Sequence, residues 1–143
     1  TEALEIVSNV SSPVVTTQAC TAIATTTATG NGPITNLGSS AVTEHGHCWS
    51  TAVNPTTADS KTTNGAGSLG AFTSAITGLT PGIPYYARAY ATNGAGTSYG
   101  ANAYFNAGLP STQLRPGQMV IKGTTLRYVG DDGREYYIQG TLV

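Results

Sequence analysis

Short runs of alternating apolar and polar residues, separated by turn residues, make up most of this chain. Thr, Val, Ile and Tyr recur in the runs, whereas the Leu, Glu, Lys and Arg of long amphipathic helices are scarce. Gly, Asn and Pro interrupt the runs at a spacing typical of a sandwich of about seven strands. The pattern predicts strands over 14–20, 23–30, 41–51, 60–64, 70–77, 84–92 and 98–106. It predicts no helix, and we expect an all-β fold.

The clearest alternation lies in the expected strand 84–92. One face carries Tyr85 followed by three small residues, Ala87, Ala89 and Ala91. The other face carries Tyr86, Arg88 and Tyr90. Small inward residues favour a close approach of two sheets. A Pro-Gly turn shortly before Tyr85 is typical of a tyrosine corner, in which the hydroxyl bonds to the backbone upstream.

The same segment resembles the signature stretch of fibronectin type III domains. The matching residues are Leu79, Pro81, Gly82, Tyr85, Arg88, Ala91, Asn93, Ala95 and Gly96. The stretches 46–51, 54–56 and 78–82 are similar to repeats in surface proteins of Bacteroidetes-like bacteria. The resemblance covers about 14–107 and implies an immunoglobulin-like sandwich used as an extracellular, non-enzymatic spacer, adhesin part or fibre element. The chain departs from these repeats at His47, where they usually have an aliphatic residue.

Turn and linker residues divide the 143 residues into three pieces. A lead strand covers 1–13, the fibronectin type III-like sandwich 14–107, and a linker with a C-terminal β-ribbon 108–143. The Gly-Leu-Pro-Ser sequence at 108–111 marks the second boundary. In the tail the pattern predicts three short strands over 119–122, 125–129 and 134–139, and such a ribbon is marginal by itself.

Charge and hydrophobicity exclude several classes of protein. Charged residues make up 9% of the chain and the net charge is −1, so it lacks the basic field of a nucleic-acid-binding protein. No apolar stretch approaches the roughly 20 residues that span a bilayer. The chain begins at Thr1 and its single methionine is Met119, which favours signal-peptide removal and an extracellular or cell-surface location.

Two glycine-rich stretches match catalytic or cofactor motifs without the required context. The stretch 65–70 reads G-x-G-x-x-G, but no helix is expected after it, as a dinucleotide site requires. The stretch 96–100 reads G-x-S-x-G, yet both histidines lie upstream and no strand-turn-helix is expected. We therefore expect no enzyme activity, no catalytic residues and no cofactor.

Metal ligands are also few. His45 and His47 would project from one strand face about 7 Å apart, with Glu44 or Cys48 as a third ligand. Strand histidines at the surface or half-buried are the favoured alternative. Asp131 and the residues beside it are read first as a hairpin turn rather than a calcium site. We expect no metal.

The two cysteines and several exposed groups are further candidates. A Cys20–Cys48 disulfide would restrict the unfolded chain by roughly 3–4 kcal/mol, and two buried thiols are the alternative. The resemblance implies that Cys48 is often a lone core residue. Tyr86, Arg88 and Tyr90 form a candidate contact face for sugars or proteins. Asn9 lies in a formal glycosylation sequon, Asn-Val-Ser.

Three hypotheses for function follow, of which the third is an accessory domain of a larger surface enzyme, with no catalysis of its own. In the first, the chain is a secreted structural subunit that forms a pilus-like, head-to-tail fibre with copies of itself by strand exchange of its ends. The candidate assembly residues are Leu4, Ile6, Val7, Val10, Tyr128, Tyr136, Tyr137 and Ile138. In the second, it is a monomeric adhesin, carbohydrate-binding module or spacer of a bacterial surface protein. Its partners would then be glycans or a cell surface.

Overall fold

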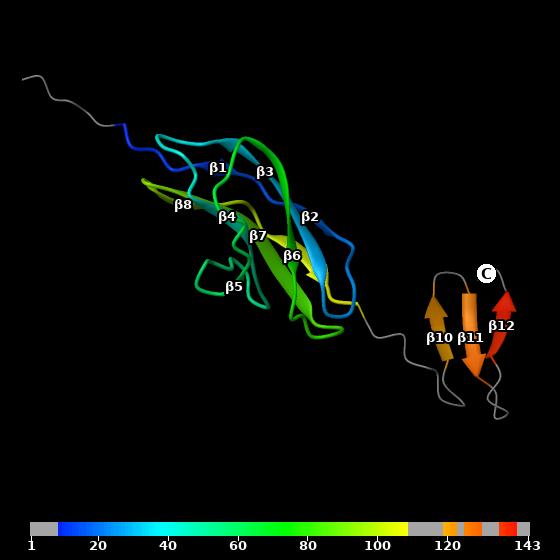
Figure 1. The fold of residues 1–143 in the computed structure, drawn as a ribbon. Helices are drawn as coiled ribbons and strands as arrows, with labels where there is room; N and C mark the ends of the chain where they lie inside the picture. Colours follow the sequence, from blue (N-terminus) through cyan, green and yellow to red (C-terminus); the bar gives the residue numbers. More distant parts are fainter. Residues whose placement is uncertain (1–8, 109–118, 123–124, 130–134, 140–143) are drawn as a thin grey trace, which may run out of the picture. The chain divides into compact units, whose positions relative to one another are not determined.

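The structure, a computed structural model, describes residues 9–108 together with the strands 119–122, 125–129 and 135–139. Contacts divide the chain into two units, Thr1–Pro110 and Ser111–Val143. Figure 1 labels the strands of both units. Every regular element in the described ranges is a β-strand, as the alternating pattern predicts. No helix among the described residues is long and apolar enough to cross a membrane.

The first unit is a sandwich of two antiparallel sheets. One sheet is built on β3 (Ala28–Asn36), which pairs along one edge with β1 (Val14–Val15) and β2 (Gln18–Thr21) and along the other with β6 (Gly70–Ile76). The other sheet is built on β4 (Glu44–Ser50) and β7 (Pro84–Asn93). Its outer strands are β5 (Ser60–Lys61) beside β4, and β8 (Gly96–Tyr99) and β9 (Ala103–Asn106) beside β7.

The predicted end of a strand at residue 30, before the turn residues 30–33, is wrong, because β3 runs through them. Gly30, Gly32 and Pro33 all pair with residues of β6, in an uninterrupted register from Ala28 to Ile34. Pairing along both edges supplies hydrogen bonds that local sequence does not encode. Two other predicted strands divide in two: 14–20 becomes β1 and β2, and 98–106 becomes β8 and β9.

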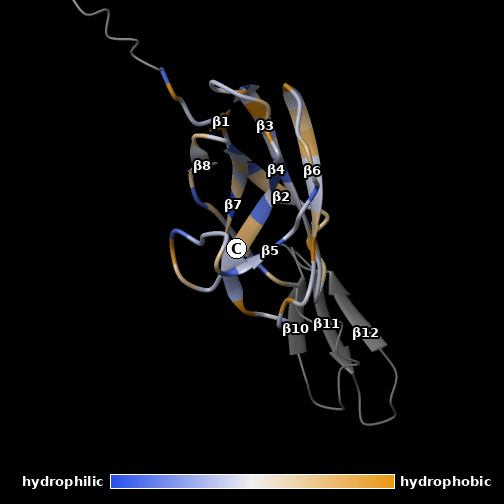
Figure 2. Ribbon diagram, turned by 60° about the vertical axis from the view of Figure 1, so that its left-hand side comes forward, coloured by the Kyte–Doolittle hydropathy of each residue, from blue (hydrophilic) through white to orange (hydrophobic). Residues whose placement is uncertain are grey.

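The core lies between the two sheets and depends on small side chains of β7. Ala87, Ala89 and Ala91 are fully buried, as the alternation predicts. On the opposite strand β3, a Cβ added to Gly32 would lie 3.1 Å from that of Ala89, so the sheets approach closely here. Larger residues fill the rest of the core, among them Ile34, Trp49, Ile76 and Phe105. Figure 2 shows hydrophobic and hydrophilic residues in alternating bands along these strands.

The second unit is a three-stranded antiparallel sheet in the order β10 (Met119–Lys122), β11 (Thr125–Val129) and β12 (Glu135–Gln139). Its strand ladders confirm the three strands predicted in the tail. Leu126 pairs with Ile121 in β10 and with Ile138 in β12. These three aliphatic residues therefore lie in register across the sheet.

Candidate binding face

The outer face of the sheet that contains β4 and β7 carries four of the five tyrosines of the first unit. Cross-strand partners share a face, so the pairs Tyr86–Tyr104 and Tyr90–Tyr99 both lie on the face opposite the buried alanines of β7. Arg88 lies between them on β7. The sequence alternation assigns Tyr86, Arg88 and Tyr90 to this face correctly. The three side chains differ, however, in how far other segments of the chain bury them.

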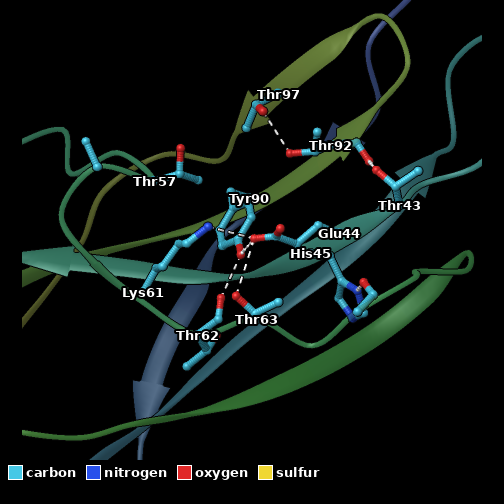
Figure 3. A network of polar contacts seen from close by, with 12 residues as sticks. Thr43, Glu44, His45, Thr57, Lys61, Thr62, Thr63, Tyr90, Thr92 and Thr97 are labelled. Atoms are coloured by element: carbon cyan, nitrogen blue, oxygen red, sulfur yellow. Dashed lines mark hydrogen bonds and ion pairs between the residues drawn. The ribbon is translucent and has the colours of Figure 1, made fainter.

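Tyr90 is fully buried, so the prediction that it belongs to an exposed contact face is wrong. Its hydroxyl oxygen lies 2.5 Å from Oε1 of Glu44 and 2.7 Å from the carbonyl oxygen of Thr62. The Lys61 ammonium lies 2.8 Å from the same Glu44 oxygen and 5.7 Å from the centre of the Tyr90 ring. Figure 3 shows these side chains converging on the Tyr90 hydroxyl.

This cluster shifts the ionisation of both partners. Hydrogen bonds from Lys61 and then from Tyr90 lower the pKa of the Glu44 carboxyl from its usual value. Burial, with Glu44 as hydrogen-bond partner, raises the pKa of Tyr90 far above its usual value. The phenol is therefore a neutral donor near neutral pH, and the cluster anchors the segment that contains Lys61 and Thr62 over the sheet.

Arg88 is also engaged within the fold. Its guanidinium carbon lies 4.7 Å from the centre of the Tyr99 ring, and its Nε donates to the carbonyl oxygen of Gly100 at 2.8 Å. The carbonyl oxygen of Pro55, in the segment between β4 and β5, lies 3.5 Å from its Nη1. The Tyr99 hydroxyl in turn accepts from the backbone N–H of Thr57 at 3.2 Å. Arg88 and Tyr99 thus hold the segment 52–59 against the sheet.

Tyr86 and Tyr104 remain accessible beyond this covered area. Tyr104 is 58% exposed and Tyr86 is half-buried, and their ring centres are 5.4 Å apart in an edge-to-face arrangement. The Tyr104 hydroxyl donates to Oδ1 of Asn106 at 3.1 Å. Sequence reasoning missed Tyr104, although its alternation with Asn102 and Asn106 in an expected strand was a usable signal.

Two asparagine amides lie near the exposed tyrosines. Asn54 donates its backbone N–H to Oδ1 of Asn102, and the Asn102 amide donates to Oδ1 of Asn54, both at 3.0 Å. Asn102 precedes Tyr104 by two positions, and Asn54 lies in the segment over the sheet. Val53, beside Asn54, is 58% exposed. The exposed part of this face therefore offers aromatic rings, amide groups and one aliphatic side chain. We call Tyr86, Tyr104, Asn54 and Asn102 the tyrosine patch.

The proposed Cys20–Cys48 disulfide is absent, and both cysteines are free. Cys20 packs on the core cluster that contains Trp49, between the sheets. Cys48 pairs with Arg88 on the outer face, where its Sγ donates to the carbonyl oxygen of Pro55 at 3.3 Å. The sheet that contains β4 therefore separates the two side chains. Burial raises the pKa of each thiol to about 11.

His45 and His47 do not form a metal site with neighbouring ligands. Both project between the sheets, and no group of three or more His, Cys, Asp or Glu residues in the described ranges is placed to hold a metal ion. Each Nδ1 has a polar partner at 2.9 Å, Gly65 O for His45 and Ser74 Oγ for His47. The expectation of surface or half-buried histidines is also wrong, because His47 is fully buried and His45 is 9% exposed.

The predicted tyrosine corner is confirmed. The backbone N–H of Thr80 donates to the Tyr85 hydroxyl oxygen at 3.1 Å, and the Tyr85 ring packs on Phe105 with ring centres 5.9 Å apart. The two glycine-rich motifs occupy non-catalytic contexts. The stretch 65–70 ends at the first residue of β6, and 96–100 contains the strand β8, so neither opens a helix.

Several predicted assembly residues fall outside the described parts of the chain. Leu4, Ile6 and Val7 lie outside the described residues, as do the Asp131–Asp132 turn residues. Val10 is 61% exposed, and Asn9 is exposed as well. The backbones of Tyr128, Tyr136, Tyr137 and Ile138 are paired within the second unit, and their side chains lie outside the described part.

Comparison with solved structures relates this fold to a sensor domain. The structure of the sensor domain of the anti-sigma factor RsgI4 in Pseudobacteroides cellulosolvens matches with a TM-score of 0.51 and 14% sequence identity. The match covers 70% of this chain and 98% of that one. The solution structure of the RsgI4 sensor domain matches with a TM-score of 0.48 and 16% identity, over 78% of this chain and 93% of that one. The first match establishes likeness of fold, a β-rich sandwich.

No protein-family model matches the sequence, and no curated protein matches it.

Proposed function

We propose that this chain is a non-enzymatic, extracellular binding module that holds neutral glycans on the tyrosine patch. The observation that carries the proposal is the exposed Tyr104 ring beside Tyr86 on an otherwise covered sheet face. An exposed aromatic ring with a polar tip is amphipathic and stacks on the apolar face of a sugar.

The neighbours of the ring suit the same ligand class. Asn54 and Asn102 each use part of their amide groups on one another, which leaves further donor and acceptor capacity for sugar hydroxyls. Arg88, two positions from Tyr86 on β7, is already engaged, since it donates to the carbonyl oxygen of Gly100 and packs on Tyr99. A neutral ligand therefore fits this surface better than an acidic one.

The arrangement of strands supports the fibronectin type III resemblance for 14–107. If β1 with β2 and β8 with β9 are each counted as one divided strand, the sandwich has three strands in one sheet and four in the other. This is the arrangement expected of such a repeat. The resemblance in turn favours a surface protein whose repeats act as adhesins or spacers.

Affinity electrophoresis of the full chain in gels that contain neutral polysaccharides tests the proposal. We expect retardation of the wild-type protein and at least a tenfold weaker retardation of Tyr104→Ser. Leu69→Ser is the matched control, because Leu69 is 60% exposed on the segment before β6, away from the patch. Undiminished binding by Tyr104→Ser, or a wild-type protein that no glycan retards, would overturn the proposal.

Self-assembly into a fibre is the second candidate, and the free edge of β6 favours it. This seven-residue strand pairs with β3 in an uninterrupted register, and among the described residues no strand pairs with its other edge. It contains neither proline nor charge, the features that usually protect edges. It is the acceptor edge that we favour for the lead segment of a second copy.

Light scattering behind a sizing column tests this candidate. A heterogeneous mass far above 14.5 kDa is expected, and deletion of 1–13 should return the protein to monomers. Thr73→Lys, which places a charge on β6, should do the same. A wild-type monomer at high concentration, or a polymer unaffected by both changes, contradicts assembly by these elements.

A further inference from the structure

His47 links the two sheets from the centre of the sandwich. It lies on β4 opposite Ala89, and its side chain is fully buried. Its Nδ1 lies 2.9 Å from Oγ of Ser74, which belongs to β6 in the other sheet. Ser74 also receives a hydrogen bond from the Asn64 amide at 3.1 Å. The imidazole is therefore part of a polar chain that crosses the core.

The backbone of β3 and the ring of Phe72 pack on the imidazole. A Cβ added to Gly30 would lie 2.6–2.9 Å from three atoms of the imidazole, so the backbone of β3 packs directly on it. The Phe72 ring centre lies 5.1 Å away, tilted by 47°. The absence of a side chain at Gly30 makes room for the histidine in place of the aliphatic residue usual in similar repeats.

The second ring nitrogen has no hydrogen-bond partner. Among the described residues, Nε2 of His47 is the one buried side-chain nitrogen or oxygen atom with none. If Ser74 donates to Nδ1, Nε2 is an unmatched donor, and if Nδ1 donates, Nε2 is an unmatched acceptor. Protonation would make both nitrogens donors and add a charge, and no acceptor is in hydrogen-bond geometry with Nε2.

No acidic side chain among the described residues packed on the ring compensates that charge. Among the described residues packed on His47, Gly30, Phe72, Ser74 and Ala89 carry no ionisable group, and the one titratable neighbour is His45 on the same strand. Glu44, the carboxylate nearest along β4, is held on the other face of the sheet by Lys61. Burial lowers the pKa of His47, His45 adds to the effect, and the backbone of Asn31 opposes it.

We propose that His47 makes the sandwich acid-labile, as a neutral inter-sheet link that breaks when the imidazole is protonated. Because the pKa in the folded state is below its ordinary 6.5, the unfolded chain binds a proton more readily as pH falls below that value. Stability is therefore unaffected by this group above pH 6.5. Below it, the unfolding equilibrium constant rises by up to about tenfold per pH unit until the folded-state pKa is reached.

Urea unfolding of the full chain between pH 7.5 and 5.0, followed by Trp49 fluorescence, tests the proposal. Trp49 is the single tryptophan and is buried in the core, so its emission reports opening of the sandwich. We expect the urea concentration at the wild-type unfolding midpoint to decrease as the pH is lowered below 6.5. His47→Phe, which keeps an aromatic ring, and His47→Asn, which keeps a partner for Ser74, should show no such fall. His45→Phe is the control and should still lose stability below pH 6.5.

Proton NMR of the histidine rings gives a readout that does not require a folded variant. The His47 ring signals of the wild-type protein should keep their neutral-form shifts as pH falls through 6.5, or should be lost only as the sandwich opens. A His47 ring that titrates near 6.5 with the fold intact would overturn the proposal. The proposal would also be overturned if the unfolding midpoint still decreased at acid pH in both His47 variants, or if it no longer decreased in His45→Phe.

Discussion

The hydroxyl oxygen of Tyr90 lies 2.5 Å from Oε1 of Glu44, and this contact ties β7 to β4 on the outer face of the sheet. The two residues are 46 positions apart and are not directly opposite in the strand register, since Tyr90 faces Gly46. Gly46 has no side chain to block the phenol, and the segment that contains Thr62 packs directly over it. A residue type that usually marks a contact surface therefore serves as an internal anchor here.

Replacing Tyr90 with phenylalanine should destabilise the sandwich. The change removes the hydroxyl from Glu44 and from the Thr62 carbonyl oxygen, and an unmatched buried group typically costs about 1–3 kcal/mol. Urea unfolding at pH 7 measures the loss. Tyr104→Phe is the matched control, because the exposed Tyr104 should change the unfolding free energy by less than about 0.5 kcal/mol. Equal stability of the two variants would contradict the anchoring role.

Replacing Lys61 with methionine should reduce the loss of folding stability at acid pH that is caused by protonation of Glu44. The Lys61 ammonium contributes most to the lowered pKa of the Glu44 carboxyl, with Tyr90 next. A lowered folded-state pKa stabilises the protein above the ordinary value of 4.5, and this stabilisation is lost as pH falls below it. Between pH 6 and pH 3, the urea unfolding midpoint should decrease less steeply in the variant than in the wild-type protein. High salt should have a similar effect, because the pair is partly exposed.

A methyl group at Gly30 should disturb the core, because its Cβ would lie 2.6 Å from Cγ of His47. Overpacking of this kind costs roughly 1–3 kcal/mol. Gly94→Ala is the control, since the nearest atom to its Cβ is the Ser40 hydroxyl at 3.2 Å. Thermal unfolding should show a clear drop for Gly30→Ala and a small change for Gly94→Ala. A double variant, Gly30→Ala with His47→Ala, should recover part of the loss if the clash with the ring is its cause.

Both cysteines should behave as protected thiols. A pKa of about 11 leaves about one thiol in a thousand ionised at pH 8, and burial restricts access further. A chromogenic disulfide reagent should therefore react slowly with the native protein and rapidly in urea, with two thiols per chain in the absence of reductant. Fewer than two thiols in the denatured, unreduced protein would show that a disulfide forms in solution.

Local sequence was sufficient to predict the features that depend only on residues close together in the chain. The alternation of 84–92 predicted which side chains of β7 face inward, because strand geometry fixes that period. The tyrosine corner was predictable because Tyr85 and Thr80 are five residues apart and a Pro-Gly turn separates them. The three strands of the tail followed from runs separated by short turns.

The sequence by itself determined an all-β chain and the face of each strand on which most side chains lie. Only the tertiary structure decided which of these faces are covered. Tyr90 and Cys48 are covered because the segments around Pro55 and Thr62 fold back over the sheet, and no strand period encodes such long-range contacts. Strand pairing likewise carried β3 through an apparent turn and brought Tyr104 beside Tyr86. The ladder hydrogen bonds that stabilise these arrangements come from strands distant in sequence, and they outweigh local turn preference.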